Sequence, residues 1–87
     1  MPVSNMDVVE RIARVIAGRM VSINAEGDSG SAAAEVDHIW RDHREDAISV
    51  LRTLREPDAA MAVAGDVETW GQMIDAALAE AGAPLEA

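Results

Sequence analysis

The densest group of residues that could do chemistry lies at 37–46 and includes both histidines of the chain, His38 and His43. Five positions separate the two imidazoles, about 140° around a helix, so they cannot bind one metal ion together as a pair four apart does. His38, Asp42 and Glu45 share a helical face and could hold a divalent cation. The simpler interpretation is a solvated lattice of helical ion pairs, and we predict no metal site.

His43 differs from its neighbours because it falls on an apolar stripe between Trp40 and Ala47. A buried imidazole needs a hydrogen-bond partner for each ring nitrogen, so a structural hydrogen bond is the simpler interpretation. A pH-sensitive contact, or stacking on Trp40, is the alternative. The serines stand in no nucleophile motif, and the Gly-containing segment at 27–30 follows no strand and precedes no Lys. We therefore predict no catalytic residue and no cofactor.

Length and composition predict one small domain over residues 1–87. The chain has no Cys, which excludes a disulfide scaffold, thiolate zinc sites and cysteine nucleophiles. Charged residues interrupt the apolar stretch near the start, so we expect neither a signal peptide nor a membrane span. A cytoplasmic protein is the expectation.

The formal net charge is -9, and its distribution is uneven. All seven basic residues lie within the first 55 positions, whereas the last 32 positions contain seven acids and no basic residue. Such a chain repels nucleic acids and anionic membranes and attracts basic proteins. Three of these acids fall in first turns of expected helices, where the macrodipole favours anions. The candidate interaction surface is therefore chiefly Asp75 and Glu80.

Apolar residues recur at spacings of three and four, which predicts helices and no strand. We expect helices at about 6–23 (capped by Ser4 or Asn5), 32–55, 57–64 and 66–82, and an exposed, flexible loop at about 24–31 that ends in a Ser31 cap. Pro57 should end the second helix and start the third, and Gly65 should cap the third in a left-handed conformation. The predicted fold class is all-α, a small bundle of three main helices plus one short helix.

Each main helix contributes an apolar stripe to the predicted core. Trp40 and Trp70, the two aromatic residues of the chain, are the expected core anchors. The alternative is that one of them lies at a dimer or partner interface. Gly18 predicts a close helix crossing. The expected stripes are Val9, Ile12, Ile16, Met20 and Ile23; Val36, Ile39, Trp40, His43, Ala47, Val50, Leu51 and Leu54; and Val67, Trp70, Ile74, Ala77, Leu78 and Ala81.

Charged residues four apart predict ion pairs along these helices. The pairs are Asp7 with Arg11, Glu10 with Arg14, Asp37 with Arg41, and Arg41 with Glu45. If the last helix packs beside the second, arginines of the second helix could also pair with its acids.

Five segments occur in an order that carries a resemblance: residues 10–14 (Glu-Arg-Ile-Ala-Arg), 54–57 (Leu-Arg-Glu-Pro), Met61, 64–65 (Ala-Gly) and 70–78 (Trp-Gly-Gln-Met-Ile-Asp-Ala-Ala-Leu). Together they resemble a family of short uncharacterised phage and prophage proteins of proteobacteria. The resemblance spans most of the chain from Glu10 onward, and the segment between 65 and 70 is shorter here than in many similar sequences. It implies an origin in a mobile element, and it carries no known activity or functional residues.

Three functions can be ranked from these observations. The first is a non-catalytic protein-interaction module that binds an unknown protein or a second copy of itself as a homodimer. The second is an acidic inhibitor or nucleic-acid mimic that binds a basic host or phage protein. An enzyme or metal protein using His38, Asp42 and Glu45 ranks last.

Overall fold

The computed structural model describes residues 3–24 and 32–83, which form helices and turns and contain no strand. The predicted all-α class is confirmed. The elements are α1 (Val8–Asn24), α2 (Ala32–Ile39), the 3-10 turn η1 (Trp40–His43), α3 (Arg44–Leu54), α4 (Ala59–Ala64) and α5 (Val67–Glu80). The Ser31 cap and nearly all of the predicted loop fall on 25–31, outside the described residues.

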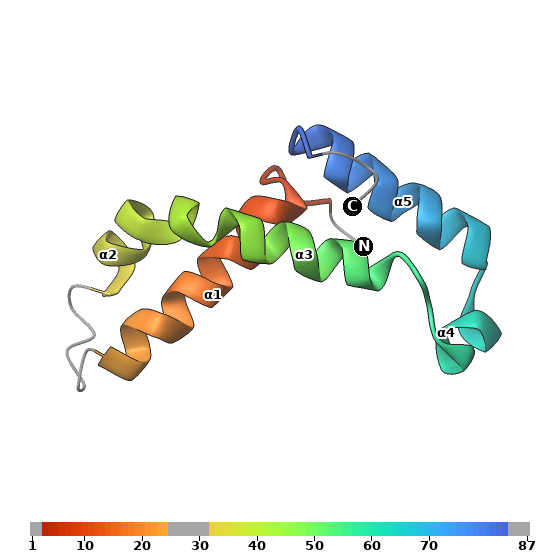
Figure 1. The fold of residues 1–87 in the computed structure, drawn as a ribbon, viewed down its shortest axis with the longest axis horizontal. Coiled ribbons are helices and arrows are strands. Elements are labelled where there is room, and N and C mark those ends of the chain that lie inside the picture. Colours follow the sequence, from red (N-terminus) through yellow and green to blue (C-terminus); the bar gives the residue numbers. More distant parts are fainter. Residues whose placement is uncertain (1–2, 25–31, 84–87) are drawn as a thin grey trace.

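The helices form an elongated arrangement (Figure 1). α1 packs on α2, η1 and α3, and α5 returns along α3 and also contacts α1. α4 lies at the far end of α3, away from α2, and makes no extensive contact with another described helix. The principal extents are 43 × 27 × 26 Å and the radius of gyration is 15.1 Å, against about 12 Å for a compact chain of this length. The α4 end therefore projects from the body.

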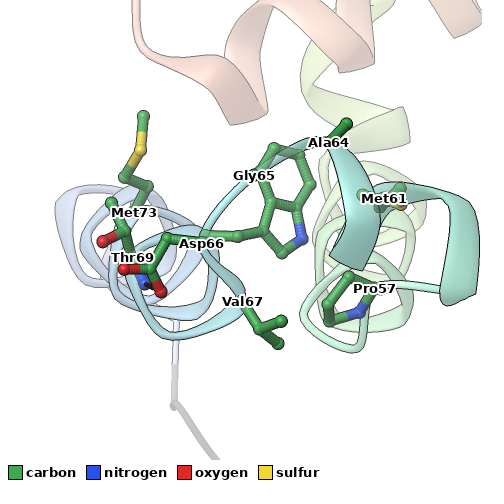
Figure 2. Close-up of a pocket in the computed structure, with 9 residues that line it drawn as sticks. Pro57, Met61, Ala64, Gly65, Asp66, Val67, Thr69 and Met73 are labelled. Carbon is green, nitrogen blue, oxygen red and sulfur yellow. Dashed lines mark hydrogen bonds between the residues drawn. The ribbon is translucent and has the colours of Figure 1, made fainter.

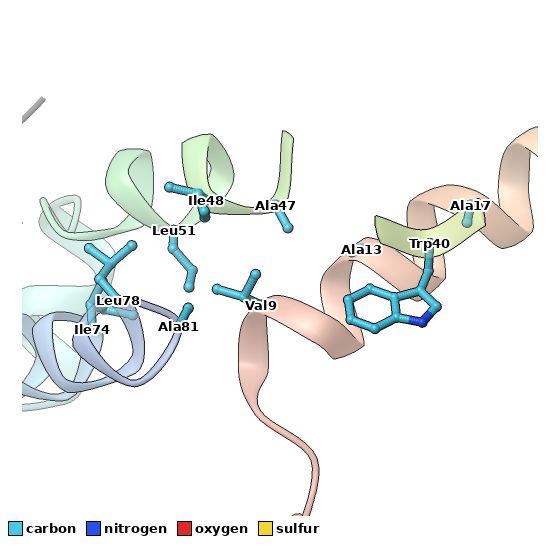
Figure 3. Close-up of a cluster of buried hydrophobic side chains, with 10 residues drawn as sticks. All are labelled: Val9, Ala13, Ala17, Trp40, Ala47, Ile48, Leu51, Ile74, Leu78 and Ala81. Atoms are coloured by element: carbon cyan, nitrogen blue, oxygen red, sulfur yellow. The ribbon is translucent and has the colours of Figure 1, made fainter. Parts of the chain in front are cut away.

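The buried cluster joins α1, η1, α3 and α5 (Figure 3). Trp40 lies near Ala13 and Ala17, and Val9 lies near Leu51 and the residues of α5. The cluster consists of Val9, Ala13, Ala17, Trp40, Ala47, Ile48, Leu51, Ile74, Leu78 and Ala81. It has no buried polar or charged residue among those described.

The predicted face of α1 is displaced by about one residue. Ala13 and Ala17 are fully buried, whereas Met20, expected inside, is 45% exposed. Alanine lets a neighbouring backbone approach closely, so the contact is centred on the two alanines and not on the larger side chains beside them. Gly18 is not such a contact: a Cβ there would lie 3.9 Å from Val36 Cγ2, an ordinary distance.

The prediction of one continuous helix over 32–55 is wrong, because η1 interrupts it. Ile39, which precedes the turn, and His43, its last residue, have φ of -113° and -105°. Residues 39–44 contain no Gly or Pro from which a helix break could be predicted. Trp40 opens the turn and is buried against α1, so tertiary packing of this ring accompanies the change in helix geometry.

The turn also changes which residues of the following helix point inward. Ala47, Ile48 and Leu51 are buried, whereas Val50 and Leu54, both predicted in the core, are 42% and 38% exposed. In α5, Ile74 and Leu78 are buried as predicted, but Val67 is 48% exposed. The sequence therefore indicated the helices correctly and their buried faces less well.

Aspartates start three of the helices. Asp7, not Ser4 or Asn5, accepts a hydrogen bond from the Glu10 N–H at 2.7 Å, and Asp58 and Asp66 cap α4 and α5 in the same way. Gly65 is extended, with φ -161°, so the predicted left-handed cap there is wrong.

The end of α5 does have a left-handed cap, at Gly82, whose φ is 75°. The Ala83 N–H donates to the Leu78 carbonyl at 3.0 Å, and the Gly82 N–H donates to the Ala79 carbonyl at 3.0 Å. These two bonds form a Schellman motif, which a glycine after a helix favours.

Candidate partner-binding groove

The candidate metal ligands are not assembled into a site. No group of three or more His, Cys, Asp or Glu side chains within residues 3–24 and 32–83 is placed to hold a metal ion, so His38, Asp42 and Glu45 are not brought together. His38 belongs to α2, Asp42 to η1 and Glu45 to α3, and the change of helix geometry between them removes the shared face that a continuous helix would give.

His43 lies at the junction of η1 and α3 and is half-buried. Its Nδ1 lies 3.6 Å from Asp46 Oδ2, and 20% of its side chain is exposed. The position is therefore partly buried, with a carboxylate one helical turn away. The pH-sensitive role stays a prediction.

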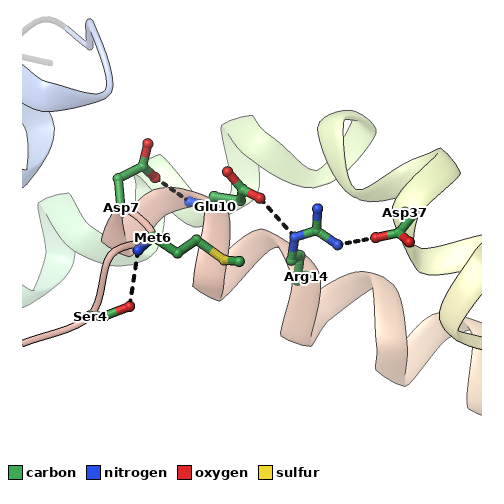
Figure 4. A network of polar contacts seen from close by, with 6 residues as sticks. All are labelled: Ser4, Met6, Asp7, Glu10, Arg14 and Asp37. Carbon is green, nitrogen blue, oxygen red and sulfur yellow. Dashed lines mark hydrogen bonds and ion pairs between the residues drawn. The ribbon is translucent and has the colours of Figure 1, made fainter.

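Trp40 meets cations on its ring. The guanidinium carbons of Arg14 and Arg41 lie 5.2 and 4.6 Å from the ring centroid, within cation–π distance. Arg14 also pairs with Glu10, as predicted, at 2.8 Å. The pairing predicted between Asp37 and Arg41 is replaced by one between Asp37 and Arg14, at 2.5 Å, which joins α1 to α2 (Figure 4).

These contacts affect the charge state of Arg14. The hydrogen bond with Asp37, and after it the one with Glu10, raises the pKa of Arg14 above its ordinary value. The guanidinium is thus fixed as a cation that links the two helices beside the Trp40 ring. The contacts of Arg14 with Glu10, Asp37 and Trp40 indicate a structural role for this residue.

The two predicted interaction acids have different surroundings. Asp75 is half-buried, and its Oδ1 lies 2.7 Å from Arg55 Nε, so its charge is countered by α3. Glu80 is exposed at the end of α5. Arg44 also donates to the Ala81 carbonyl, so arginines of the second predicted helix do reach the last one.

The most unusual surface is α4, with the sequence Ala-Ala-Met-Ala-Val-Ala. None of its six residues is buried, and Val63 is 90% exposed. A helix that is apolar all round is normally buried in a larger core. Within residues 3–24 and 32–83, no helix packs extensively on α4.

A groove runs between α4 and the first half of α5 (Figure 2). Met61 and Ala64 lie on its α4 side, and Val67 and Met73 lie on its α5 side. Its volume is about 350 Å³. The lining residues are Pro57, Met61, Ala64, Gly65, Asp66, Val67, Thr69, Trp70 and Met73.

Trp70 holds the wall of this groove in place. Its indole Nε1 donates to the Leu54 carbonyl at 2.6 Å, which ties α5 to the last residue of α3. The ring is half-buried and lines the groove. Of the two predicted core anchors, Trp40 therefore belongs to the buried cluster. Trp70 packs against the edge of that cluster and also faces the groove.

The groove presents apolar surface and few reactive groups. Asp66 is the one titratable residue among those that line it, and its Oδ1 accepts from the Glu68 and Thr69 N–H groups. A second, shallower hollow, lined by Val8, Met73, Ala76, Ala77 and Glu80, adjoins it through Met73. Such a surface is suited to binding an apolar group more than to transforming a substrate.

The sequence contained a signal for this site that the periodicity analysis missed. Six consecutive apolar residues at 59–64 have no polar side to turn to solvent, so a short helix there must be covered or exposed. Which of the two holds depends on where α5 packs, and that is a tertiary property.

The chain is a small all-α protein with an open apolar groove at one end. None of its described helices is both long and apolar enough to cross a membrane. Comparison with protein-family models, with curated proteins and with solved structures gave no match. The phage resemblance is therefore neither supported nor contradicted, and it stays a prediction.

Proposed function

We propose that this protein is a non-catalytic interaction module that binds another polypeptide in the groove between α4 and α5. The observation that carries the proposal is α4, an entirely apolar helix with no buried residue. When a partner covers an exposed apolar surface, the removal of that surface from water favours association by about 25 cal/mol per Å² of apolar area.

The surroundings of the groove support the same function. Asp58 and Asp66 cap the two helices that form it, and Trp70 is hydrogen-bonded to the end of α3. The α5 wall, which carries Trp70 and core residues, is therefore fixed before a partner arrives, whereas α4 is held mainly by its Asp58 cap. A fixed wall avoids part of the entropic cost of ordering the site on binding.

The second candidate is an acidic inhibitor that mimics nucleic acid. The uneven charge of the sequence supports it, but the ion pairs of the structure weaken that support. Asp75 pairs with Arg55, which leaves Glu80 as the free member of the predicted pair of acids. A mimic of nucleic acid needs a regular array of uncompensated anions, because phosphate contacts dominate such binding. The groove makes the first candidate the stronger one.

A photo-crosslinking amino acid at position 73 tests the proposal. Met73 lines the groove and is 62% exposed, and the matched control is position 15, because Val15 is 66% exposed on α1. We expect a discrete covalent adduct in host cells from position 73 and none from position 15. An adduct of twice the chain mass identifies a homodimer. Equal labelling from both positions, or none from either, contradicts binding at the groove.

The origin and place of action are part of the same proposal. The resemblance to phage and prophage proteins, which rests on the five segments from 10–14 to 70–78, supports such an origin. The acidic composition without cysteine is compatible with action in the cytoplasm. Finding the coding sequence among phage structural, regulatory or lysis genes would support this origin. A coding sequence that lies among housekeeping genes in every genome that contains it would contradict it.

A further inference from the structure

The groove between α4 and α5 has a shape and a charge that specify its occupant. We infer that it binds a basic amphipathic helix, with apolar side chains in the groove and Lys or Arg side chains over its acidic rim. This inference rests on the proposed function, and it adds the secondary structure and the charge of the partner.

The shape favours a helix. The groove and the neighbouring hollow share Met73, so together they follow α5 from Val67 to Ala77. At ~1.5 Å per residue that path is about 15 Å long, the length of roughly three helical turns. Residues 3–24 and 32–83 include no strand whose edge could pair with an extended peptide, so strand addition has no template in this part of the chain.

The charge of the rim favours a basic partner. Glu56, Asp58, Asp66 and Glu68 are all exposed; Asp66 lines the groove, and the other three are adjacent in sequence to residues that line it. The sequence has no Lys or Arg after Arg55, and Arg55 pairs with Asp75. Among residues 3–24 and 32–83 the ion pairs of the structure include none of these four acids, so a cationic helix gains attraction that an anionic one lacks.

Two of these charges are also fixed in position. Asp58 Oδ1 accepts from the Met61 N–H at 3.0 Å, and Asp66 Oδ1 accepts from the Glu68 N–H at 2.9 Å. Each carboxylate is thus held at the start of a groove helix, while its side chain remains exposed. The helix macrodipole offsets part of each charge but leaves Glu56 unaffected.

The same charges argue against a second copy as the occupant. The first 55 residues contain all seven Arg but also nine Asp and Glu, so both parts of the chain are negative. Any docking of one copy on another brings two chains of formal charge -9 together. Repulsion between them opposes the association at low ionic strength.

A pair of synthetic peptides tests the inference on the full chain. The first is an amphipathic helix of about 14 residues built from Leu and Lys, long enough for the ~15 Å path. The second has Glu at every Lys position. Binding is followed by NMR through the amide signals of residues 58–73 and the indole signal of Trp70. We expect the Lys peptide to bind at least about 10-fold more tightly at low salt, and the difference to shrink as salt screens the charges.

Matched variants show whether the binding is at the groove and its rim. V67S combined with M73S changes two half-exposed lining residues, and V15S is the control on α1. E56Q combined with E68Q removes two rim charges that cap no helix, and E35Q is the control on α2. The first pair should abolish binding of the Lys peptide, and the second should weaken it several-fold while both controls retain it.

The outcomes separate the inference from the proposed function. Equal affinity for both peptides, with shifts confined to the groove, overturns the charge selectivity and keeps the groove as a docking site. Groove shifts that appear on raising protein concentration, with no response to either peptide, identify a second copy as the occupant and overturn the inference alone. Peptide shifts that are unaffected by V67S/M73S, or no groove shift in either experiment, overturn both.

Discussion

Arg14 joins several elements through one side chain. Its guanidinium pairs with Glu10 on its own helix and with Asp37 on α2, and it lies over the ring of Trp40 in η1. A planar guanidinium can pair with carboxylates along its edge and stack with its face at the same time, which an ammonium cannot do. The position of Trp40 at the helix break is therefore held from two helices.

Arg14→Ala should lower the thermal unfolding midpoint more than Arg11→Ala does. Arg11 is exposed on the same helix and provides the matched control. Because the pKa of Arg14 is raised in the folded state, its contribution is complete below the ordinary arginine pKa and is lost only as pH rises beyond the raised value. The midpoint difference between the two variants should therefore persist through neutral and mildly alkaline pH in thermal scans. Equal midpoints for both variants would contradict the linking role.

Gly18→Ala should stabilise the protein by about 0.5 to 1 kcal/mol. Glycine in the interior of α1 costs helix propensity, and a Cβ at this position meets Val36 at an ordinary contact distance. Urea unfolding measures the change. A loss of stability would show that the added methyl group lies closer to Val36 than the expected 3.9 Å and clashes with α2.

Gly82→Ala provides the opposite case. Space is open around this residue, but its φ of +75° is costly for any residue with a Cβ. The substitution should destabilise the protein by about 1 to 2 kcal/mol in the same urea experiment. An unchanged stability would indicate that the end of α5 contributes little to the fold.

At the scale of elements, the two helices of the groove differ in what holds them. α5 places Ile74 and Leu78 in the buried cluster, whereas α4 buries no residue. Local helix formation and its cap are thus the main support for α4, and six residues are too few for a stable isolated helix. α4 should exchange its amide hydrogens faster than α5 does.

The capping aspartates test this difference. Asp66→Ala should cost about 1 kcal/mol of global stability, because it removes the cap of a helix that carries core residues. Asp58→Ala should reduce helix content while changing the global free energy of unfolding by less than about 0.5 kcal/mol. Circular dichroism and urea unfolding measure the two quantities. Equal global losses would mean that α4 is packed more firmly than its exposure indicates.

Elements whose ends depend on local chemistry could be predicted from the sequence. Pro57 and Gly82 act through their own backbone, so the breaks near them were predicted. The break at η1 depends on how Trp40 packs on Ala13 and Ala17, which no local pattern encodes. The groove depends in the same way on tertiary packing, because none of the described helices packs extensively on α4.

At the scale of the whole molecule, shape and charge coincide. α4, which projects from the body, belongs to the last 32 residues of the chain, which contain no basic residue. Most ion pairs that the structure describes lie between Glu10 and Asp46, and one, Arg55 with Asp75, reaches into the acidic region. The acidic end therefore gains little from internal pairing.

This imbalance should make the stability of the protein increase with salt. Like charges on a chain of formal charge -9 repel one another in the folded state, and added ions screen that repulsion. Raising NaCl from low to physiological ionic strength should raise Tm by about 2 to 4 °C, the shift that roughly 0.5 kcal/mol produces in a domain of this size.

A variant with reduced charge provides the control for this effect. E56Q, E68Q and E80Q together remove three exposed acids of the unpaired end, so the variant should start from a higher Tm at low salt and respond less to NaCl. A basic helix bound in the groove should act in the same direction, because a ligand that binds the folded state stabilises it. A Tm that falls as NaCl is added would mean that screening of the Arg14 and Arg55 ion pairs outweighs screening of the repulsion. Repulsion among the acids after Arg55 would then be too weak to favour a cationic partner.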